Sequence, residues 1–268
     1  NATEKLLASG KTDAKYHAAS HPREAEIEAI ARICSFAEYT GARIMVFHVS
    51  TREGVDIIRA AKSRGVRVLA ETCPHYLLMT VDILEQPRAE RFLCSPPQRT
   101  IDDQMALWDG IRDGTIGLIT SDHAPYRMDK SGKFSNGTDA PFNRIANGMP
   151  GLETRLPLMF DSMIHKQGLS LQDFVRLTAT APAQSFNLKG KGLIAPGYDA
   201  DIAIWDPRLP HRYGADDLHD NVGYNAFEGA EVQGMPVTVL SRGRVIVAHR
   251  RPTGVPGMGK WLAMQRTI

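Results

Sequence analysis

Two residues in this sequence stand where catalytic side chains of parallel α/β proteins are found. His48 ends the apolar run 43–48, and Asp122 comes two residues after the apolar run 116–120. In parallel α/β barrels the chemistry lies at the carboxyl ends of strands, and a His and an Asp from separate strands are suitable ligands for a catalytic zinc. A metal hydrolase is therefore one interpretation. The other is structural, because a strand-end His is often a buried packing residue and a strand-end Asp is often a helix cap.

The elements that must position these residues alternate between helix and strand signals. Ile27, Ile30, Cys34 and Ala37 recur with the period of one helix face, and Gly41 marks the end of that helix. The expected helices span residues 22–39, 51–64 and 101–113, and the expected strands span residues 43–48, 66–71 and 116–120. Strands separated by helices of this size predict a parallel sheet with crossover helices.

The character of the chain changes after Asp122. Residues 123–152 are rich in Gly, Pro, Asn and Ser, and a loop of this length is expected to be functional. Helices are expected at about 154–167 and 171–184, and short strands at 201–205, 237–240 and 244–247. The chain therefore reads as a βα-repeat segment followed by a small β part.

Composition excludes several classes of protein. The chain has 268 residues, a formal net charge of +2 and no basic run, so no nucleic-acid partner is expected. No apolar stretch approaches the roughly 18–20 residues that span a bilayer, so no membrane partner is expected. Cys34, Cys73 and Cys94 have neither disulfide-framework nor zinc-ribbon spacing, and a cytoplasmic location is the simplest interpretation. Asn1 stands where an initiator Met would, which suggests a fragment or a processed chain.

A series of motifs occurs in a fixed order along the chain. They are FHVS at 47–50, ETCPHYL at 71–77, LCSPPQR at 93–99, TSDHAPY at 120–126 and NGMPGLETR at 147–155. The series resembles the dihydropyrimidinase and hydantoinase branch of the amidohydrolase superfamily. The stretches GLIAPGYDADIAIWDP at 192–207 and VLSRGRVIV at 239–247 resemble that superfamily's return to its small β domain.

The resemblance implies a fold and an activity. The fold would be α/β, with strands 6–8 of a TIM-like (β/α)8 barrel and their helices over residues 1–190. Part of a small β-sandwich domain and a tail would follow over residues 191–268. The activity would be metal-dependent hydrolysis of the cyclic amide bond of dihydropyrimidines or 5-substituted hydantoins to N-carbamoyl amino acids. The partner would be a small cyclic amide or ureide, and the family tends towards homodimers and homotetramers.

Family roles can be carried over to residues that match the motifs. His48 would be a metal ligand at the end of strand 6. Asp122 would be a metal ligand at the end of strand 8 and the general base. Ser95 and Asn147 would hold the ring amide, largely through main-chain groups. Local alternatives remain open, because Ser95 precedes two prolines and could initiate a turn, and Asn147-Gly148 is a common turn dipeptide.

Other histidines are expected to have supporting or surface roles. His75 stands at a family position that also tolerates Gln, so it is not expected to be a ligand. His123 is expected to support Asp122 by a hydrogen bond. His17 and His21 flank the start of a helix rather than end a strand, and they are interpreted as surface residues. Lys15 has no strand context.

Part of the family's metal site has no counterpart here. The resemblance calls for two divalent metal ions, expected to be zinc. Their other ligands are a His-x-His pair, a carboxylated Lys and a further His, all in the missing N-terminal half with the Tyr that polarises the carbonyl. His48 and Asp122 would be two of six metal-binding side chains, and two ligands rarely hold a catalytic metal. The chain alone is therefore expected to be inactive. It is also expected to be poorly folded, because the absence of five barrel strands would leave strand edges and apolar faces exposed.

Related functions remain as alternatives. Allantoinases and dihydroorotases share segments like ETCPHYL and DHAP, whereas NGMPG together with CSPPQR favours the hydantoinase branch. A non-catalytic scaffold relative is the alternative from another class. Because such relatives typically lose metal ligands, the presence of both His48 and Asp122 argues against it.

Overall fold

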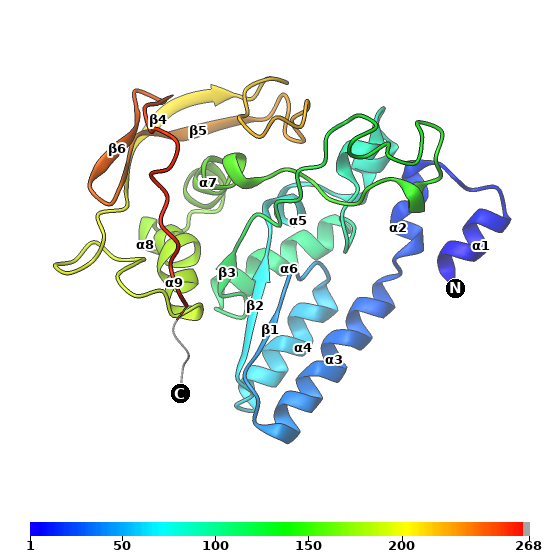
Figure 1. Cartoon of the computed structure of the whole chain (residues 1–268). Helices are drawn as coiled ribbons and strands as arrows, with labels where there is room; N and C mark the ends of the chain where they lie inside the picture. Colours follow the sequence, from blue (N-terminus) through cyan, green and yellow to red (C-terminus); the bar gives the residue numbers. More distant parts are fainter. Residues whose placement is uncertain (265–268) are drawn as a thin grey trace. The chain divides into compact units, whose positions relative to one another are not determined.

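The computed structural model describes residues 1–264 (Figure 1). The chain forms two compact units. Unit 1 consists of Asn1–Arg155 and Gly214–Glu228, and unit 2 consists of Leu156–Tyr213 and the chain from Gly229 onwards. This division by compactness differs from the expected boundary between residues 190 and 191, which stays a prediction. Residues 265–268 of the expected second domain lie outside the described residues. Within the described part, no helix has the length and apolar character needed to cross a membrane.

The sheet of unit 1 is parallel. Its strands β1 (Ile44–Val46), β2 (Val68–Thr72) and β3 (Leu118–Ile119) pair in the order β1-β2-β3. Met45 lies opposite Leu69, and Thr72 lies opposite Ile119. The predicted parallel sheet is therefore confirmed, with β1 and β3 shorter than the apolar runs that predicted them.

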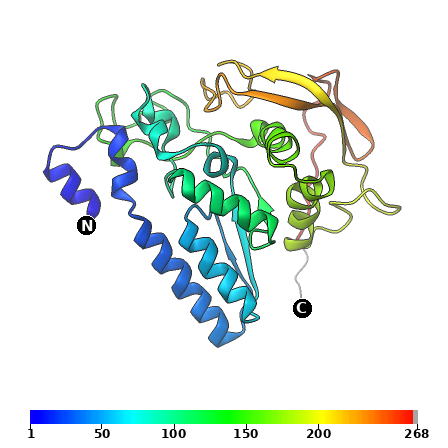
Figure 2. The same ribbon diagram turned by 180° about the vertical axis from the view of Figure 1, so that it is seen from behind.

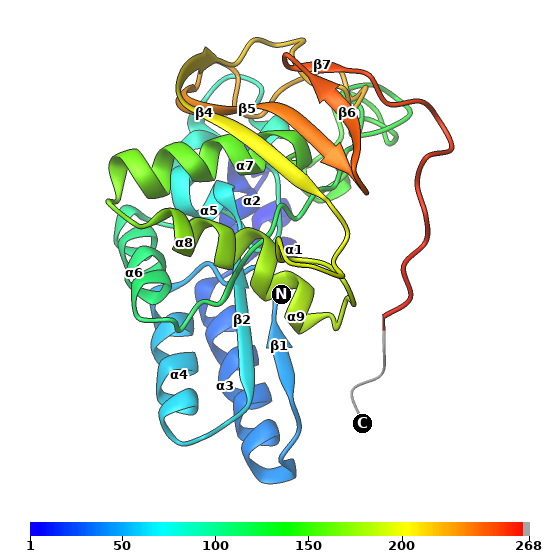
Figure 3. The same ribbon diagram turned by 90° about the vertical axis from the view of Figure 1, so that its left-hand side faces the viewer.

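The crossover helices form where the periodicity predicts them. They are α3 (Arg23–Thr40), α4 (Arg52–Ser63) and α6 (Ile101–Arg112). Gly41 ends α3 with a φ of +69°, a left-handed conformation that glycine adopts without steric cost. Contacts join α3 with α4 and α4 with α6, and both α3 and α4 contact the strands (Figures 2 and 3). Ile30, Cys34 and Ala37 form the buried face of α3.

A buried carboxylate fastens these helices to one another. The Asp103 side chain, 2% exposed, accepts bonds of 2.8 and 3.2 Å from the Arg23 guanidinium of α3 and 2.9 Å from the Arg52 N–H of α4. Burial raises the pKa of Asp103, but its hydrogen bonds outweigh burial and bring it to about 2. The carboxylate therefore stays charged at neutral pH and holds three helix ends together.

Short helices make up much of the rest of unit 1. They are α1 (Ala2–Ala8), η1 (Ala14–Tyr16), α2 (His17–Ser20), α5 (Pro74–Leu78), η2 (Val81–Glu85), η3 (Ala89–Phe92) and η4 (Phe142–Arg144). Helix α7 (Leu152–Phe160) follows the long loop 123–152.

The helices of unit 2 contain π-helical turns. Segment η5 (Asp161–Lys166) continues α7, and η6 (Arg176–Thr180) joins α8 (Leu171–Val175) to α9 (Ala181–Ser185). Both helical regions expected at 154–167 and 171–184 are therefore present. The Ser170 hydroxyl accepts a 3.0 Å bond from the Asp173 N–H and forms a capping box at the start of α8.

The sheet of unit 2 is antiparallel and larger than predicted. Strands β4 (Ile202–Arg212), β5 (Glu231–Ser241), β6 (Arg244–Ala248) and β7 (Arg251–Pro252) pair in chain order. Strands are present at all three expected positions, 201–205, 237–240 and 244–247. The expected lengths of the first two were wrong, since β4 and β5 have 11 residues each. Pro207, Pro210 and Pro236 lie within these strands, and proline in a sequence argues against a strand. Register shifts in the β4–β5 ladder accommodate the prolines.

Replacing Gly234 by Ala tests the packing of β5 within unit 2. Gly234 has a φ of +102°, and an added Cβ would lie 2.3 Å from Cδ1 of Phe160, whose ring stacks on Trp205. We expect Gly234→Ala to lower the free energy of unfolding by about 1–3 kcal/mol, measured by urea denaturation of the whole protein. Gly257→Ala is the control, because Gly257 also has a positive φ but open space around it. Equal losses for the two variants would contradict the packing explanation.

Candidate functional site

The carboxyl ends of the parallel strands bring the predicted site residues to one edge of the sheet. Beyond the ladder, the Val49 N–H donates to the Glu71 carbonyl at 2.9 Å, and the Thr120 N–H donates to the Thr72 carbonyl at 3.1 Å. His48 therefore leaves β1 at the level of Glu71, and Asp122 follows β3 just beyond Thr120. The ends of β1 and β3 flank the end of β2.

His48 and Asp122 share an unusual backbone conformation. Their φ angles are +43° and +45°, in the left-handed region that side chains other than glycine seldom adopt. His and Asp enter this region more readily than most residues, yet the conformation still has an energetic cost and is concentrated at functional sites. Both strands therefore turn sharply at the residue that the sequence selected as a metal ligand.

Burial and the charges of His48 and Asp122 shift the pKa values of two side chains that come after β2 in the chain. Burial, and then the charge of His48, lowers the pKa of His75 to about 3, so His75 is neutral. Burial, and then the charge of Asp122, raises the pKa of the Cys94 thiol to about 12, so this thiol is protonated. Neither Cys94 nor His75 is thus poised for acid–base work near neutral pH, and His75 is fully enclosed.

Glu71 is a carboxyl group buried at the centre of this edge. Its Oε1 accepts hydrogen bonds from the Thr120 hydroxyl and from the Cys73 thiol, at 3.4 Å to Sγ, while its Oε2 has no partner among the described residues. Burial raises the pKa of Glu71. The group is therefore easier to protonate than an ordinary glutamate.

The described residues fit a metal ion in donor type but not in number. Imidazole and carboxylate are ordinary zinc ligands, and His48 and Asp122 supply one of each. Residues 1–264 contain no group of three or more His, Cys, Asp or Glu side chains arranged to hold a metal ion. A catalytic site needs about three protein ligands. These two residues would have to be joined by ligands from elsewhere.

A buried ion pair holds the loop that follows His48. Glu26 Oε1 accepts bonds from the N–H groups of Ser50 at 2.8 Å and Thr51 at 3.2 Å, and its Oε2 accepts from the Ser50 hydroxyl at 2.5 Å. Oε2 also pairs with Arg99 at 3.2 Å, and both side chains are only 10% exposed. Helix α3 therefore fixes the β1–α4 turn and the end of the LCSPPQR segment at once.

Ser95 and Asn147, the residues predicted to hold the ring amide, are brought together. Their positions are 52 residues apart in the chain, yet Asn147 Nδ2 donates to Ser95 Oγ at 2.5 Å. Beside them, the Gly148 N–H donates to the Leu93 carbonyl at 2.8 Å. The NGMPG and CSPPQR motifs therefore lie against each other.

A buried lysine organises the long loop. The Lys133 side chain is fully buried, and its Nζ donates to the carbonyls of Ala146 at 3.0 Å and Gly148 at 2.8 Å. Burial lowers the pKa of Lys133 to about 8. The loop 123–152 is thus folded around one amine that positions the backbone beside Asn147.

Sequence reasoning missed Glu26, Arg99 and Lys133. Arg99 closes one of the quoted motifs and could have been singled out for that reason. A glutamate in the first turn of a helix and a lysine in a polar loop are common, so neither Glu26 nor Lys133 carried a local signal.

The structure differs from the expectations for three histidines. His17 is not a surface residue, because it is 3% exposed and its Nε2 donates to the Cys94 carbonyl at 2.8 Å. Cys94 lies 77 residues away in the chain, so a local sequence pattern could not predict this contact. His21, expected beside it on the surface, is half-buried and contacts Ser95. In the described part of the chain, His123 Nδ1 accepts from the N–H groups of Gly151 and Leu152 rather than bonding to Asp122.

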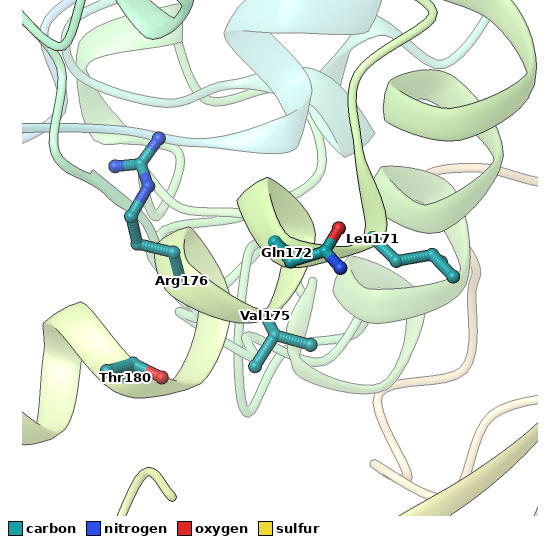
Figure 4. Close-up of a pocket in the computed structure, with 5 residues that line it drawn as sticks. All are labelled: Leu171, Gln172, Val175, Arg176 and Thr180. Atoms are coloured by element: carbon teal, nitrogen blue, oxygen red, sulfur yellow. The ribbon is translucent and has the colours of Figure 1, made fainter.

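Unit 2 has apolar hollows, and none of the predicted site residues lines them. One hollow of about 330 Å³ is lined by residues of α8 and η6. Figure 4 shows these side chains, which are Leu171, Gln172, Val175, Arg176 and Thr180. The charge of Arg176 is paired with Asp173 at 3.1 Å, which leaves the hollow without an acid–base group. A larger groove of about 930 Å³ in the same unit is lined mainly by apolar side chains such as Phe160, Phe174 and Trp205. The edge of the parallel sheet is therefore the better candidate for chemistry.

Comparison with known proteins adds an independent finding. A model of the amidohydrolase family matches residues 3–246. A D-hydantoinase from Ralstonia pickettii is 40% identical over 266 residues, which cover 98% of this chain and 57% of that protein. A D-phenylhydantoinase from Escherichia coli is 39% identical over 259 residues, which cover 96% of this chain and 56% of that protein. The chain therefore spans a little over half the length of these relatives.

Solved structures are similar over the same part. A dihydropyrimidinase from Brevibacillus agri is 37% identical with a TM-score of 0.89, covering 94% of this chain and 55% of that one. An L-hydantoinase from Arthrobacter aurescens is 31% identical with a TM-score of 0.86, covering 97% of this chain and 56% of that one. The expected fold class, an α/β fold of the metal-dependent hydrolase type, is thereby confirmed.

Removing the charge of Glu26 tests the buried ion pair. Glu26→Gln leaves the Arg99 guanidinium enclosed without its counter-ion, so we expect a loss on the order of 3 kcal/mol in the free energy of unfolding of the whole protein. Glu38→Gln is the matched control, because Glu38 pairs with Arg64 at the surface, where ion pairs contribute little. A melting temperature equally changed in both variants would rule out a special role for Glu26.

Burial of His17 predicts a pH-dependent stability. Its pKa falls from 6.5 to about 4, chiefly through burial, so on acidification the unfolded chain takes up the proton before the folded one. The stabilising contribution of neutral His17 is complete above about pH 6.5 and is lost as the pH falls towards 4. Between pH 7 and pH 5, the free energy of unfolding should therefore fall in both proteins, but by about 2 kcal/mol less in His17→Gln than in the wild type. Urea unfolding at the two pH values measures this difference. His249→Gln, at an exposed histidine, should follow the wild type, and parallel curves for all three proteins would refute the assignment.

Proposed function

The chain belongs to the amidohydrolase family, and from this premise we propose that the whole protein hydrolyses cyclic amide bonds. The substrates would be dihydropyrimidines or 5-substituted hydantoins, and the products N-carbamoyl amino acids. Relatives named D-hydantoinase and D-phenylhydantoinase, at about 40% identity, support this substrate class.

The observation that carries the proposal is the pair His48 and Asp122. Both follow strands that flank β2, and both adopt a left-handed backbone at the same edge of the sheet. An imidazole and a carboxylate held there have the chemistry needed to bind a metal and to move a proton. Alternative hollows in unit 2 offer no such pair.

Asp122 would act as the general base. Its side chain is exposed at the end of β3, where it can accept a proton from the attacking water and deliver it to the leaving ring nitrogen. Ser95 and Asn147 would hold the ring amide through their main-chain groups. The contact between their side chains supports a shared role.

His48 and Asp122 would contribute to a site for two divalent ions, which we propose to be zinc. The family is generally metal-dependent. When bound, such an ion makes water a nucleophile near neutral pH and polarises the carbonyl of the scissile amide. The remaining ligands, a carboxylated Lys among them, would come from the part of the protein that this chain does not span.

The whole protein would complete a barrel around this sheet. We propose that β1, β2 and β3 are strands 6–8 of a (β/α)8 barrel within residues 1–190, and that residues 191–268 belong to a small β domain. Exposed apolar side chains support the proposal, since Ile33, Phe36 and Tyr39 of α3 and Phe47 beyond β1 are 40%, 58%, 91% and 51% exposed. We further propose a cytoplasmic homodimer or homotetramer.

Turnover of ring substrates by the full-length protein tests the function. We expect zinc-dependent ring opening of dihydrouracil and of a 5-substituted hydantoin, with no hydrolysis of allantoin. Activity on allantoin alone, or on none of these rings with metal bound, would overturn the proposed substrate class.

The variant Asp122→Asn tests the role of the base. Because it removes the proton acceptor, we expect the turnover rate to fall by at least about 100-fold while the protein remains folded. Asp139→Asn, on the long loop, is the control. Metal content measured alongside activity separates loss of the ion from loss of the base, and near-wild-type turnover in Asp122→Asn would exclude it as base.

A further inference from the structure

We propose that His21 is a positioning residue for the ring-amide site, acting through the hydroxyl of Ser95. This inference rests on the proposed function, since it concerns the residues expected to hold the ring. Its geometric basis is a chain of side-chain hydrogen bonds that begins at Ser20, passes through the His21 ring and Ser95, and ends at Asn147.

The hydrogen bonds assign the tautomer of His21. The Ser20 hydroxyl donates its proton to the His17 carbonyl at 2.7 Å, so it can only accept at its contact with His21 Nδ1, 2.8 Å away. Nδ1 also lies 3.1 Å from the same carbonyl, which is an acceptor only. Nδ1 therefore carries the hydrogen, and the Nε2 of a neutral ring is an acceptor.

This tautomer determines what the Ser95 hydroxyl does. Ser95 Oγ lies 3.1 Å from His21 Nε2 and donates its proton to it, while Asn147 Nδ2 donates to the same oxygen at 2.5 Å. The hydroxyl proton and one lone pair of the oxygen are thus used within the protein. The side chains of Ser95 and Asn147 hold each other, and His21 determines the direction of the hydroxyl.

The main-chain groups of the same two residues are left for a ligand. Within residues 1–264, neither the N–H nor the C=O of Ser95 or Asn147 makes a hydrogen bond to the protein. A planar cyclic amide presents one donor and one acceptor side by side, which suits paired main-chain groups of fixed orientation. The side-chain network would therefore hold the recognition surface without touching the ring.

His21 is itself held on several sides. Its carbonyl accepts from Arg99 Nη1 at 2.9 Å, and its ring packs against the His17 ring with centroids 4.5 Å apart. His17 in turn donates to the carbonyl of Cys94, the neighbour of Ser95. One short segment thus binds two consecutive residues of the LCSPPQR motif, which restricts the position of Ser95.

A double-mutant cycle in the full-length, metal-loaded protein tests the proposal. We expect His21→Ala to raise KM for a 5-substituted hydantoin about tenfold while kcat changes less than about threefold. His21→Gln should restore most of the loss, because its amide oxygen can accept the Ser95 hydroxyl. If His21 acts through Ser95, the double variant with Ser95→Ala should be no worse than the more affected single variant. Additive effects, or an unchanged KM in His21→Ala, would overturn the proposal.

A second measurement needs no turnover. In protein labelled with ¹⁵N-histidine, the imidazole resonances assigned by their loss in His21→Ala should show hydrogen on Nδ1 and a hydrogen-bond acceptor at Nε2. Ser95→Ala should shift the Nε2 resonance of His21, whereas His249→Ala should leave it unchanged. If no ring substrate is opened, the proposed function fails while this result still decides whether the His21–Ser95 bond exists. Hydrogen on Nε2 would overturn the positioning role.

Discussion

Parallel pairing of β1, β2 and β3 is the constraint on which the candidate site depends. Parallel strands point the same way, so the residues after each strand meet at one edge although the crossover helices separate them in the chain. The ladder ends at Thr72 and Ile119. His48 and Asp122 follow β1 and β3 at that level, and Glu71 is the last but one residue of β2. A change in register of one strand would move its polar end away from the others.

Buried charges then hold the loops that this edge needs. Loops have no ladder of their own, and their backbone groups must find partners elsewhere. Glu26, Asp103 and Lys133 supply these partners from positions with little access to water. In a low-dielectric setting such bonds are strong, and losing one partner leaves a charge uncompensated. The same groups therefore support stability and the placement of the site.

The candidate site contains two kinds of residue, which differ in how the protein holds them. His48 and Asp122 turn away from the ladder in a left-handed conformation, whereas the side chains of Ser95 and Asn147 are engaged with each other and with His21. Positioning of this kind suits catalysis, because binding groups fixed in advance lose little freedom when substrate arrives. These contacts lie within the stretch that matches the amidohydrolase family.

Features that depend on neighbouring residues were predictable from the sequence. The buried face of α3, the glycine that ends it, and the strand-end positions of His48 and Asp122 follow from local periodicity and turn chemistry. The alternation of helices and strands predicted a parallel sheet but not the order of its strands. Only the tertiary structure decided the burial of His17 and the pairing of Glu26 with Arg99, 73 residues away. It also decided the length of β4 and β5, whose prolines are tolerated through shifts in the ladder. These features could not be read from the sequence because each depends on a partner that only folding brings near.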